Sequence, residues 1–158
     1  MKIKKNIDHL KLEFSESLPI GKQKERVVFN YLINNDNIIE IIENDDSRFD
    51  QTVVCKNKKF TIEIKFDNMC LKTGNFAVEC ESRGRPSGIK TTQSDLWCFV
   101  DSEDKMYFIK TSDLRKMCIT KKPIQTRCED SWNKVFLVKV SDFNILSINV
   151  NKYLDNEN

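Results

Sequence analysis

The feature that most constrains the fold is residues 59–66, Lys-Phe-Thr-Ile-Glu-Ile-Lys-Phe, in which apolar and polar side chains alternate. A period of two is that of a β-strand, whose successive side chains point to opposite faces of a sheet. The face predicted to enter the core consists of Phe60, Ile62, Ile64 and Phe66. The opposite face carries Glu63 and Lys65, so a carboxylate and an ammonium group are expected side by side on it.

A hairpin is predicted around this strand. Residues 49–55 are also rich in β-forming side chains, and the polar residues 56–58 separate the two segments. If paired residue numbers sum to 113, Asp50 lies opposite Glu63; if they sum to 115, Asp50 faces Lys65. Either odd sum places Asp50 on the charged face, whereas an even sum turns it away. A two-residue turn in this segment gives an odd sum.

Two carboxylates and an ammonium on one face are the groups that metal-assisted hydrolysis of a phosphodiester requires. Asp50 and Glu63 offer hard oxygen ligands to Mg²⁺, with Mn²⁺ as an alternative. A bound metal activates water and offsets charge on the phosphate, while Lys65 would orient or help deprotonate that water. Glu25, in a helix predicted over residues 19–34, is the candidate for a further catalytic carboxylate.

The triplet Glu-x-Lys alone is weak evidence, because it occurs twice in the chain. The second copy begins at Glu103 and lies in an acidic turn with no apolar strand around it. The first copy has a more specific setting: a helix with Glu25, then Asp50, a tight turn, and the alternating strand that holds Glu63-Ile64-Lys65.

This order resembles the PD-(D/E)XK nuclease superfamily, whose core is an αβββαβ unit. Residues 75–97 are similar to small phage and mobile-element members, and the resemblance spans about residues 19–140. It departs from the strict pattern at Phe49, where the family has proline. The resemblance implies an α/β (α+β) restriction-endonuclease-like fold with a mixed central sheet flanked by helices. It further implies a Mg²⁺-dependent DNA endonuclease that acts as a homodimer, without separating homing, resolvase, restriction and repair subclasses.

The loop that follows residue 82 is the second candidate site. Its basic and hydroxyl side chains could hold a phosphate backbone, and glycines would allow close approach. The alternative is a solvated turn followed by an ordinary helix start near residues 91–92. The candidate DNA-binding residues are Arg83, Arg85, Ser87, Lys90, Thr91 and Thr92. Glu79 and Glu81 could add a metal ligand or simply face solvent.

The remaining segments complete a single domain over residues 1–158. Residues 1–17 are expected to form an extended arm and residues 150–158 a flexible tail. The other expected elements are strands at 38–43, 75–81 and 134–140, a hairpin at 96–100 and 105–110, a helix at 111–119 and a loop at 120–133.

Composition bounds the class of protein. With 39% hydrophobic and 32% charged residues, the chain has enough apolar material for a globular core. A net charge of +2 excludes a protein that coats nucleic acid through charge alone. No apolar run approaches the ~18 residues that span a bilayer, and the polar start is no signal peptide. The six cysteines lack zinc or redox spacing, so free thiols in a reducing, cytoplasmic compartment are expected. The small size and the abundance of Asn, Ile and Lys, which fits an AT-rich genome, favour a virus- or mobile-element-encoded protein.

Two other interpretations remain open at this stage. A non-catalytic module that binds nucleic acid or protein could share the fold. Its mark would be a site carboxylate turned away from the others, or one neutralised by a structural salt bridge with Lys65. An unrelated α+β fold with accidental motifs is the third interpretation.

Overall fold

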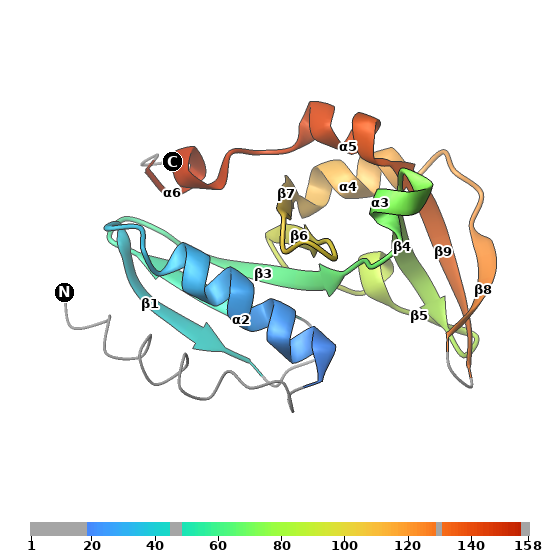
Figure 1. Ribbon diagram of the computed structural model, residues 1–158, viewed down its shortest axis with the longest axis horizontal. Helices are drawn as coiled ribbons and strands as arrows, with labels where there is room; N and C mark the ends of the chain where they lie inside the picture. The colour runs from blue at the N-terminus through green and yellow to red at the C-terminus, as the bar shows by residue number, and fades with distance from the viewer. Residues whose placement is uncertain (1–18, 45–48, 129–130, 156–158) are drawn as a thin grey trace.

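The computed structural model describes residues 19–44, 49–128 and 131–155, so the expected arm at residues 1–17 lies outside the described residues. Two β-sheets organise these residues (Figure 1). The five-stranded sheet has the order β1-β2-β3-β6-β7 and the four-stranded sheet the order β5-β4-β9-β8. The first sheet holds the charged strand.

The first sheet is mixed. Its strands are β1 (Ile38–Glu43), β2 (Gln51–Cys55), β3 (Lys59–Phe66), β6 (Leu96–Val100) and β7 (Met106–Lys110). Neighbouring strands run antiparallel except β3 and β6, which are parallel. Parallel neighbours require a crossover connection, and α3 (Cys70–Thr73) lies in it. The order α2, β1, β2, β3, α3, β6 therefore contains the expected αβββαβ series.

The crossover also contributes β4 (Asn75–Ser82) and β5 (Arg85–Pro86) to the second sheet. The other two strands of this sheet are β8 (Ile124–Cys128) and β9 (Ser131–Lys139). The helices outside the crossover are α2 (Ile20–Leu32), α4 (Thr111–Cys118), α5 (Val140–Leu146) and α6 (Val150–Asp155). None of the helices in the described part of the chain is long and apolar enough to cross a lipid bilayer.

One core lies between α2 and the first sheet. Figure 1 shows α2 lying across β3. The predicted apolar face of β3 is buried there through Phe60, Ile62 and Ile64. Leu154 of α6 is fully buried in the same core, so the expected flexible tail is wrong for residues 150–155. Its few apolar residues dock on the core, which a local pattern does not reveal.

A second core joins the two sheets and decides the environment of the charged face. Phe76 of β4 stacks on Phe99 of β6, with ring centroids 4.3 Å apart. Trp97, the neighbour of Glu63 on β6, is fully buried in this core. The face that carries Glu63 is thus partly covered by the second sheet instead of standing open to solvent.

Two expected elements are corrected by the structure. No helix begins at residues 91–92: a 3₁₀ turn, η2 (Gly88–Lys90), precedes them, and the Asp95 carboxylate accepts a hydrogen bond from the Thr61 amide at 2.9 Å. The expected loop at 120–133 contains β8 and the start of β9. Since β8 is a polar edge strand, it lacks the alternation of a half-buried strand.

The cysteines within the described residues behave as small apolar side chains. Cys55, Cys80 and Cys98 are buried as expected, as are Cys70 and Cys118, and all five are free thiols.

Candidate active site

The β2–β3 hairpin adopts the first of the two registers considered. Gln51 pairs with Ile62, a sum of 113, and the Cys55 amide donates to the Lys58 carbonyl at 2.7 Å across a two-residue turn. The Asp50 amide donates to the Ile62 carbonyl at 2.9 Å. The Asp50 carboxylate accepts from the Ile64 amide at 2.7 Å. These two bonds reach the residues on either side of position 63 and hold Asp50 beside Glu63.

Glu63 is the most perturbed carboxyl of this site. Its side chain is buried at 7% exposure. The pKa of Glu63 is raised to about 7, mainly by burial; Lys65 opposes this rise, and the neighbouring Asp50 carboxylate adds to it. Low polarity and a neighbouring negative charge both disfavour a second ionised carboxylate. The Asp50–Glu63 pair therefore has too little positive charge around it to keep both carboxyls ionised.

Lys65 stands beside this pair without neutralising it. Its Nζ lies 3.7 Å from Glu63 Oε2, beyond the length of a normal hydrogen bond, and 5.8 Å from the centre of the Trp97 ring. The Lys65 side chain is 39% exposed. Because the pKa of Glu63 stays raised next to it, the ammonium group is a neighbour of the site and can reach a molecule that enters from solvent.

The first turns of α2 bring Glu25 to the same group. Glu25 accepts a hydrogen bond from Lys22 Nζ at 3.0 Å. Burial raises the pKa of Glu25, Lys22 opposes this, and the charges of Asp50 and Glu43 raise it again. The structure therefore brings together all four residues that the sequence suggested as catalytic: Glu25, Asp50, Glu63 and Lys65.

Sequence reasoning missed two residues of this region. Glu43 ends β1, pairs with Gln51 in the sheet and forms an ion pair with Arg26 at 3.3 Å. Gln51 is fully buried, and its Nε2 donates to the Glu25 carbonyl at 2.9 Å, which ties α2 to the strand that follows Asp50. The signal in the sequence that could have identified them is a polar residue at a core-facing position of a strand.

The fold of the chain is similar to that of a solved protein, although the sequences differ. No family model matches the chain, and no curated protein matches it significantly. Hjc, a Holliday junction resolvase from the archaeal hyperthermophile Archaeoglobus fulgidus, matches with a TM-score of 0.55 and 11% sequence identity. The match covers 87% of this chain and 98% of that chain. The chain shares the fold of this protein. Hjc has the PD-(D/E)XK nuclease fold, so the fold expected from the sequence is confirmed.

The candidate DNA-binding residues lie on other elements, and they do not share one environment. Arg83, Arg85, Lys90 and Thr91 are exposed on the β4–β5 hairpin and on or beside η2. Thr92 is buried, and its hydroxyl bonds to Ser94 at 3.0 Å, so it is withdrawn from the DNA-contacting set.

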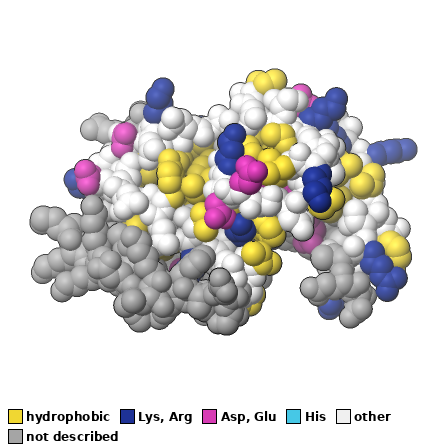
Figure 2. Space-filling view, in the orientation of Figure 1, with side chains coloured by type: hydrophobic (Ala, Val, Ile, Leu, Met, Phe, Trp, Pro, Cys, Tyr) yellow, Lys and Arg dark blue, Asp and Glu magenta, His cyan; other side chains and the backbone are white. Residues whose placement is uncertain are grey.

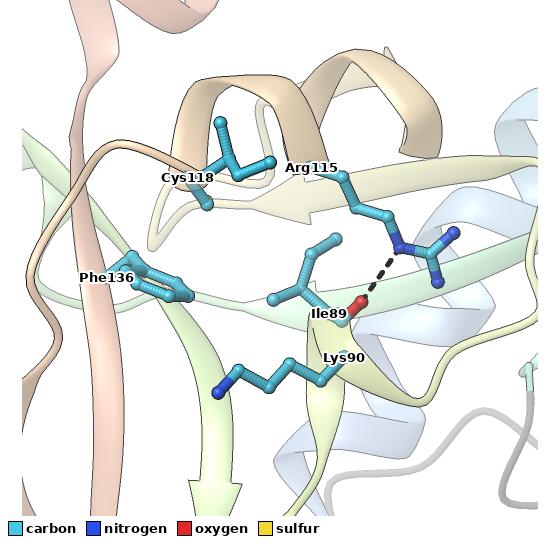
Figure 3. A pocket seen from close by; sticks show the side chains of 6 residues that line it. Ile89, Lys90, Arg115, Cys118 and Phe136 are labelled. Atoms are coloured by element: carbon cyan, nitrogen blue, oxygen red, sulfur yellow. Dashed lines mark hydrogen bonds between the residues drawn. The ribbon is translucent and has the colours of Figure 1, made fainter.

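The buried groups of this loop stabilise the loop itself. The Ser87 hydroxyl oxygen is buried, which leaves it no route to a ligand. Arg115 of α4 donates from Nε to the Ile89 carbonyl at 3.0 Å, and from Nη2 to the Thr92 carbonyl at 2.5 Å. Figure 3 shows that the Lys90 side chain extends away from Arg115. Lys90 therefore remains available at the surface.

Glu79 and Glu81 are not part of the carboxylate group. The Glu81 carboxylate pairs with Lys134 at 3.3 Å on the second sheet. Neither residue contributes to the raised pKa of Glu25 or Glu63. The structure thus gives no support to a third metal ligand from β4.

A divalent metal fits the Asp50–Glu63 pair. Within the described residues, no three His, Cys, Asp or Glu side chains gather closely enough to hold a metal ion. Mg²⁺ needs fewer protein ligands, because it keeps several waters and binds through one or two carboxylates together with phosphate oxygens. A cation between Asp50 and Glu63 would remove the repulsion that raises the pKa of Glu63.

Proposed function

We propose that the protein is a metal-dependent DNA endonuclease that hydrolyses phosphodiester bonds with Mg²⁺ or Mn²⁺. The observation that carries this proposal is the buried Glu63 carboxyl, held beside the partly buried Asp50 carboxylate and next to Lys65. A purely structural role would favour apolar residues at a position as buried as Glu63, because an uncompensated buried carboxylate costs stability. The nuclease fold of the chain supports the same conclusion.

In this proposal each residue of the site has a defined role. Asp50 and Glu63 would hold the metal, which when bound supplies an acidic water and a positive charge for the phosphate. Lys65 orients the attacking water and donates to a phosphate oxygen as negative charge builds there. Glu25 adds negative charge next to Asp50 and holds Lys22, whose ammonium would contact the DNA backbone.

The proposed substrate is DNA, and the proposed assembly is a homodimer in which each subunit cuts one strand. The net charge of +2 requires that positive side chains be concentrated locally. Figure 2 shows Lys and Arg side chains around the end of the molecule that carries β8 and β9. We infer that Arg83, Arg85 and Lys90 hold the DNA on this side. A four-way junction is the first branched substrate to test, because the similar fold belongs to a Holliday junction resolvase.

The alternative of a non-catalytic binding module is less well supported. Its first mark, a carboxylate turned away, is at odds with the contact between Asp50 and Glu63. Its second mark, neutralisation by a salt bridge with Lys65, is met only in part: Lys65 forms an ion pair with Glu63 at 3.7 Å, but the pKa of Glu63 stays raised.

The test is incubation with supercoiled plasmid and with a four-way junction in Mg²⁺, Mn²⁺ or EDTA. Cleavage should require the metal and fall at least ~100-fold in Asp50→Asn and Lys65→Ala. Glu40→Gln, an exposed residue of β1, is the matched control and should cut normally. If a folded wild-type protein binds both DNAs and cuts neither in either metal, the nuclease proposal fails and the binding module replaces it.

A further inference from the structure

Trp132 lies in an unexpected environment. Tryptophan is a large apolar side chain that is highly buried on average, and Trp97 is fully buried. Trp132, near the start of β9, is 53% exposed. It is followed at every second position by Lys134, Phe136 and Val138, of which the last two are buried in the core between the sheets. An indole exposed where a core-facing row of side chains continues leaves a flat apolar surface open to solvent.

The indole borders a hollow of about 430 Å³ between the β4–β5 hairpin and the β8–β9 hairpin. The Arg83 amide donates to the Trp132 carbonyl at 3.1 Å, which fixes the two hairpins to each other. The Arg127 guanidinium lies 5.5 Å from the centre of the indole ring. The side chains that line the hollow include Glu81, Arg83, Gln125, Trp132 and Lys134.

The β4–β5 turn presents its arginines outward. Arg83 has φ 52° and Gly84 has φ 78°, and positive φ at both central residues is the geometry of a type I′ hairpin turn. Glycine or asparagine is favoured at the first of these positions, so an arginine there is strained. Both Arg83 and Arg85 are exposed, and Arg83 lines the hollow.

The chemistry of the hollow selects a nucleotide with an unpaired base. An exposed aromatic face binds a base by stacking, and cations around it bind the phosphates. A side-chain amide such as that of Gln125 can donate to and accept from a base edge. Bases within a duplex are stacked on their neighbours, so only an unpaired or extruded base can reach the indole. The volume also lies in the range of small-ligand pockets, roughly 300–1,000 Å³.

Charge alone does not account for binding at this place. The hollow carries three positive charges, from Arg83 and Lys134 in its lining and Arg127 beside the indole, against the negative charge of Glu81. Lys134 and Glu81 offset each other as an ion pair at 3.3 Å, so Arg83 and Arg127 provide the remaining positive charge. Stacking must therefore supply most of the selectivity.

We propose that this hollow binds an unpaired nucleotide of the DNA substrate, with its base stacked on Trp132. The proposal rests on the proposed function in taking DNA as the substrate. It assigns the substrate to the class of DNA with a single-stranded element, such as a branch, a flap or a strand end. Fully paired linear DNA offers no such base.

The two tryptophans make the proposal measurable by fluorescence. Trp97 is shielded, so a ligand-dependent change in emission reports Trp132. The titration uses the full chain in EDTA, with single-stranded oligothymidylate and a blunt duplex of equal length as probes. The single strand should quench the emission saturably and the duplex should not.

Two variants and a control test the stacking contact. Trp132→Ala should weaken binding of the single strand at least about fivefold by fluorescence anisotropy of a labelled oligonucleotide. Trp132→Phe should abolish the quenching and keep most of the affinity, because phenylalanine also stacks. Leu137→Ala, at a 40% exposed position of the same strand, should change neither signal.

The outcomes separate this inference from the nuclease proposal. Loss of single-strand binding in a folded Trp132→Ala, with or without cleavage by the wild type, supports the nucleotide site. Unchanged affinity in that variant, or equal quenching by single strand and duplex, overturns it even if the protein cuts DNA. If neither probe quenches the emission, the proposal is also overturned, and a protein partner becomes the occupant of this surface to test.

Discussion

Replacing Glu63 by glutamine should stabilise the metal-free protein above pH 7 and abolish cleavage. In the folded protein, burial and the Asp50 carboxylate raise the pKa of Glu63 to about 7, whereas a carboxyl in the unfolded chain titrates near 4.5. At about 1.4 kcal/mol per pH unit, this difference costs the folded state about 3 kcal/mol once Glu63 is ionised in both states. Glutamine keeps the shape and removes the charge.

The sign of the effect follows from proton binding. Between pH 4.5 and 7, the folded protein holds more protons at Glu63 than the unfolded chain does. The free energy of unfolding of the wild type therefore falls as the pH rises through this window, and it suffers no such loss below pH 4.5. The variant lacks this loss.

Urea denaturation in EDTA at pH 4.5 and pH 8.5 measures the difference. The stability of Glu63→Gln relative to the wild type should increase by about 3 kcal/mol between the two conditions. Glu40→Gln, exposed on β1, should show no such change. A Glu63→Gln variant whose relative stability is the same at both pH values would refute the argument that the site is a strained carboxylate pair.

Other consequences of the structure can be measured with single variants. Lys65→Ala should slow single-turnover cleavage at least ~100-fold. The melting temperature and DNA binding should stay nearly unchanged, because the Lys65 side chain is partly exposed. A large drop in the melting temperature of this variant would contradict the catalytic role of Lys65. Gly88→Ala should destabilise the fold by more than ~2 kcal/mol in urea, because the new Cβ would lie 2.2 Å from a backbone oxygen, while Gly84→Ala, with open space around it, should cost only about 1 kcal/mol. A thiol reagent should react rapidly with at most one of the six cysteines before unfolding, since five are buried; two or more fast thiols would contradict the described cores.

The hairpin and its charged residues were predictable because their signals are local. The alternation of residues 59–66 and the polar turn before it determine the faces of both strands. Once the turn contains two residues, either register places Asp50 on the face that carries Glu63 and Lys65, without any information from the rest of the chain. The structure selects the register that puts Asp50 next to Glu63. Glu25 required the further step of placing α2 against this sheet, which the resemblance supplied and the structure bears out.

The burial of the site could not be predicted, because it depends on distant residues. Trp97 covers the strand beside Glu63 only after the crossover returns the chain to the first sheet. Likewise, β8 has the composition of a loop and becomes a strand by pairing with β9. The exposure of Trp132 depends on how far the second sheet extends beyond the core, which no local pattern contains.

The most direct test of the account is a calorimetric titration of Mn²⁺ into the full chain at pH 8 and pH 6. Because Glu63 must lose its proton to bind a cation, the wild type should bind at pH 8 and about tenfold more weakly at pH 6. Glu63→Gln should lose at least ~10-fold in affinity at pH 8, and Glu40→Gln should match the wild type. No binding by the wild type, or binding that Glu63→Gln leaves unchanged, would contradict the assignment of Asp50 and Glu63 as the metal site.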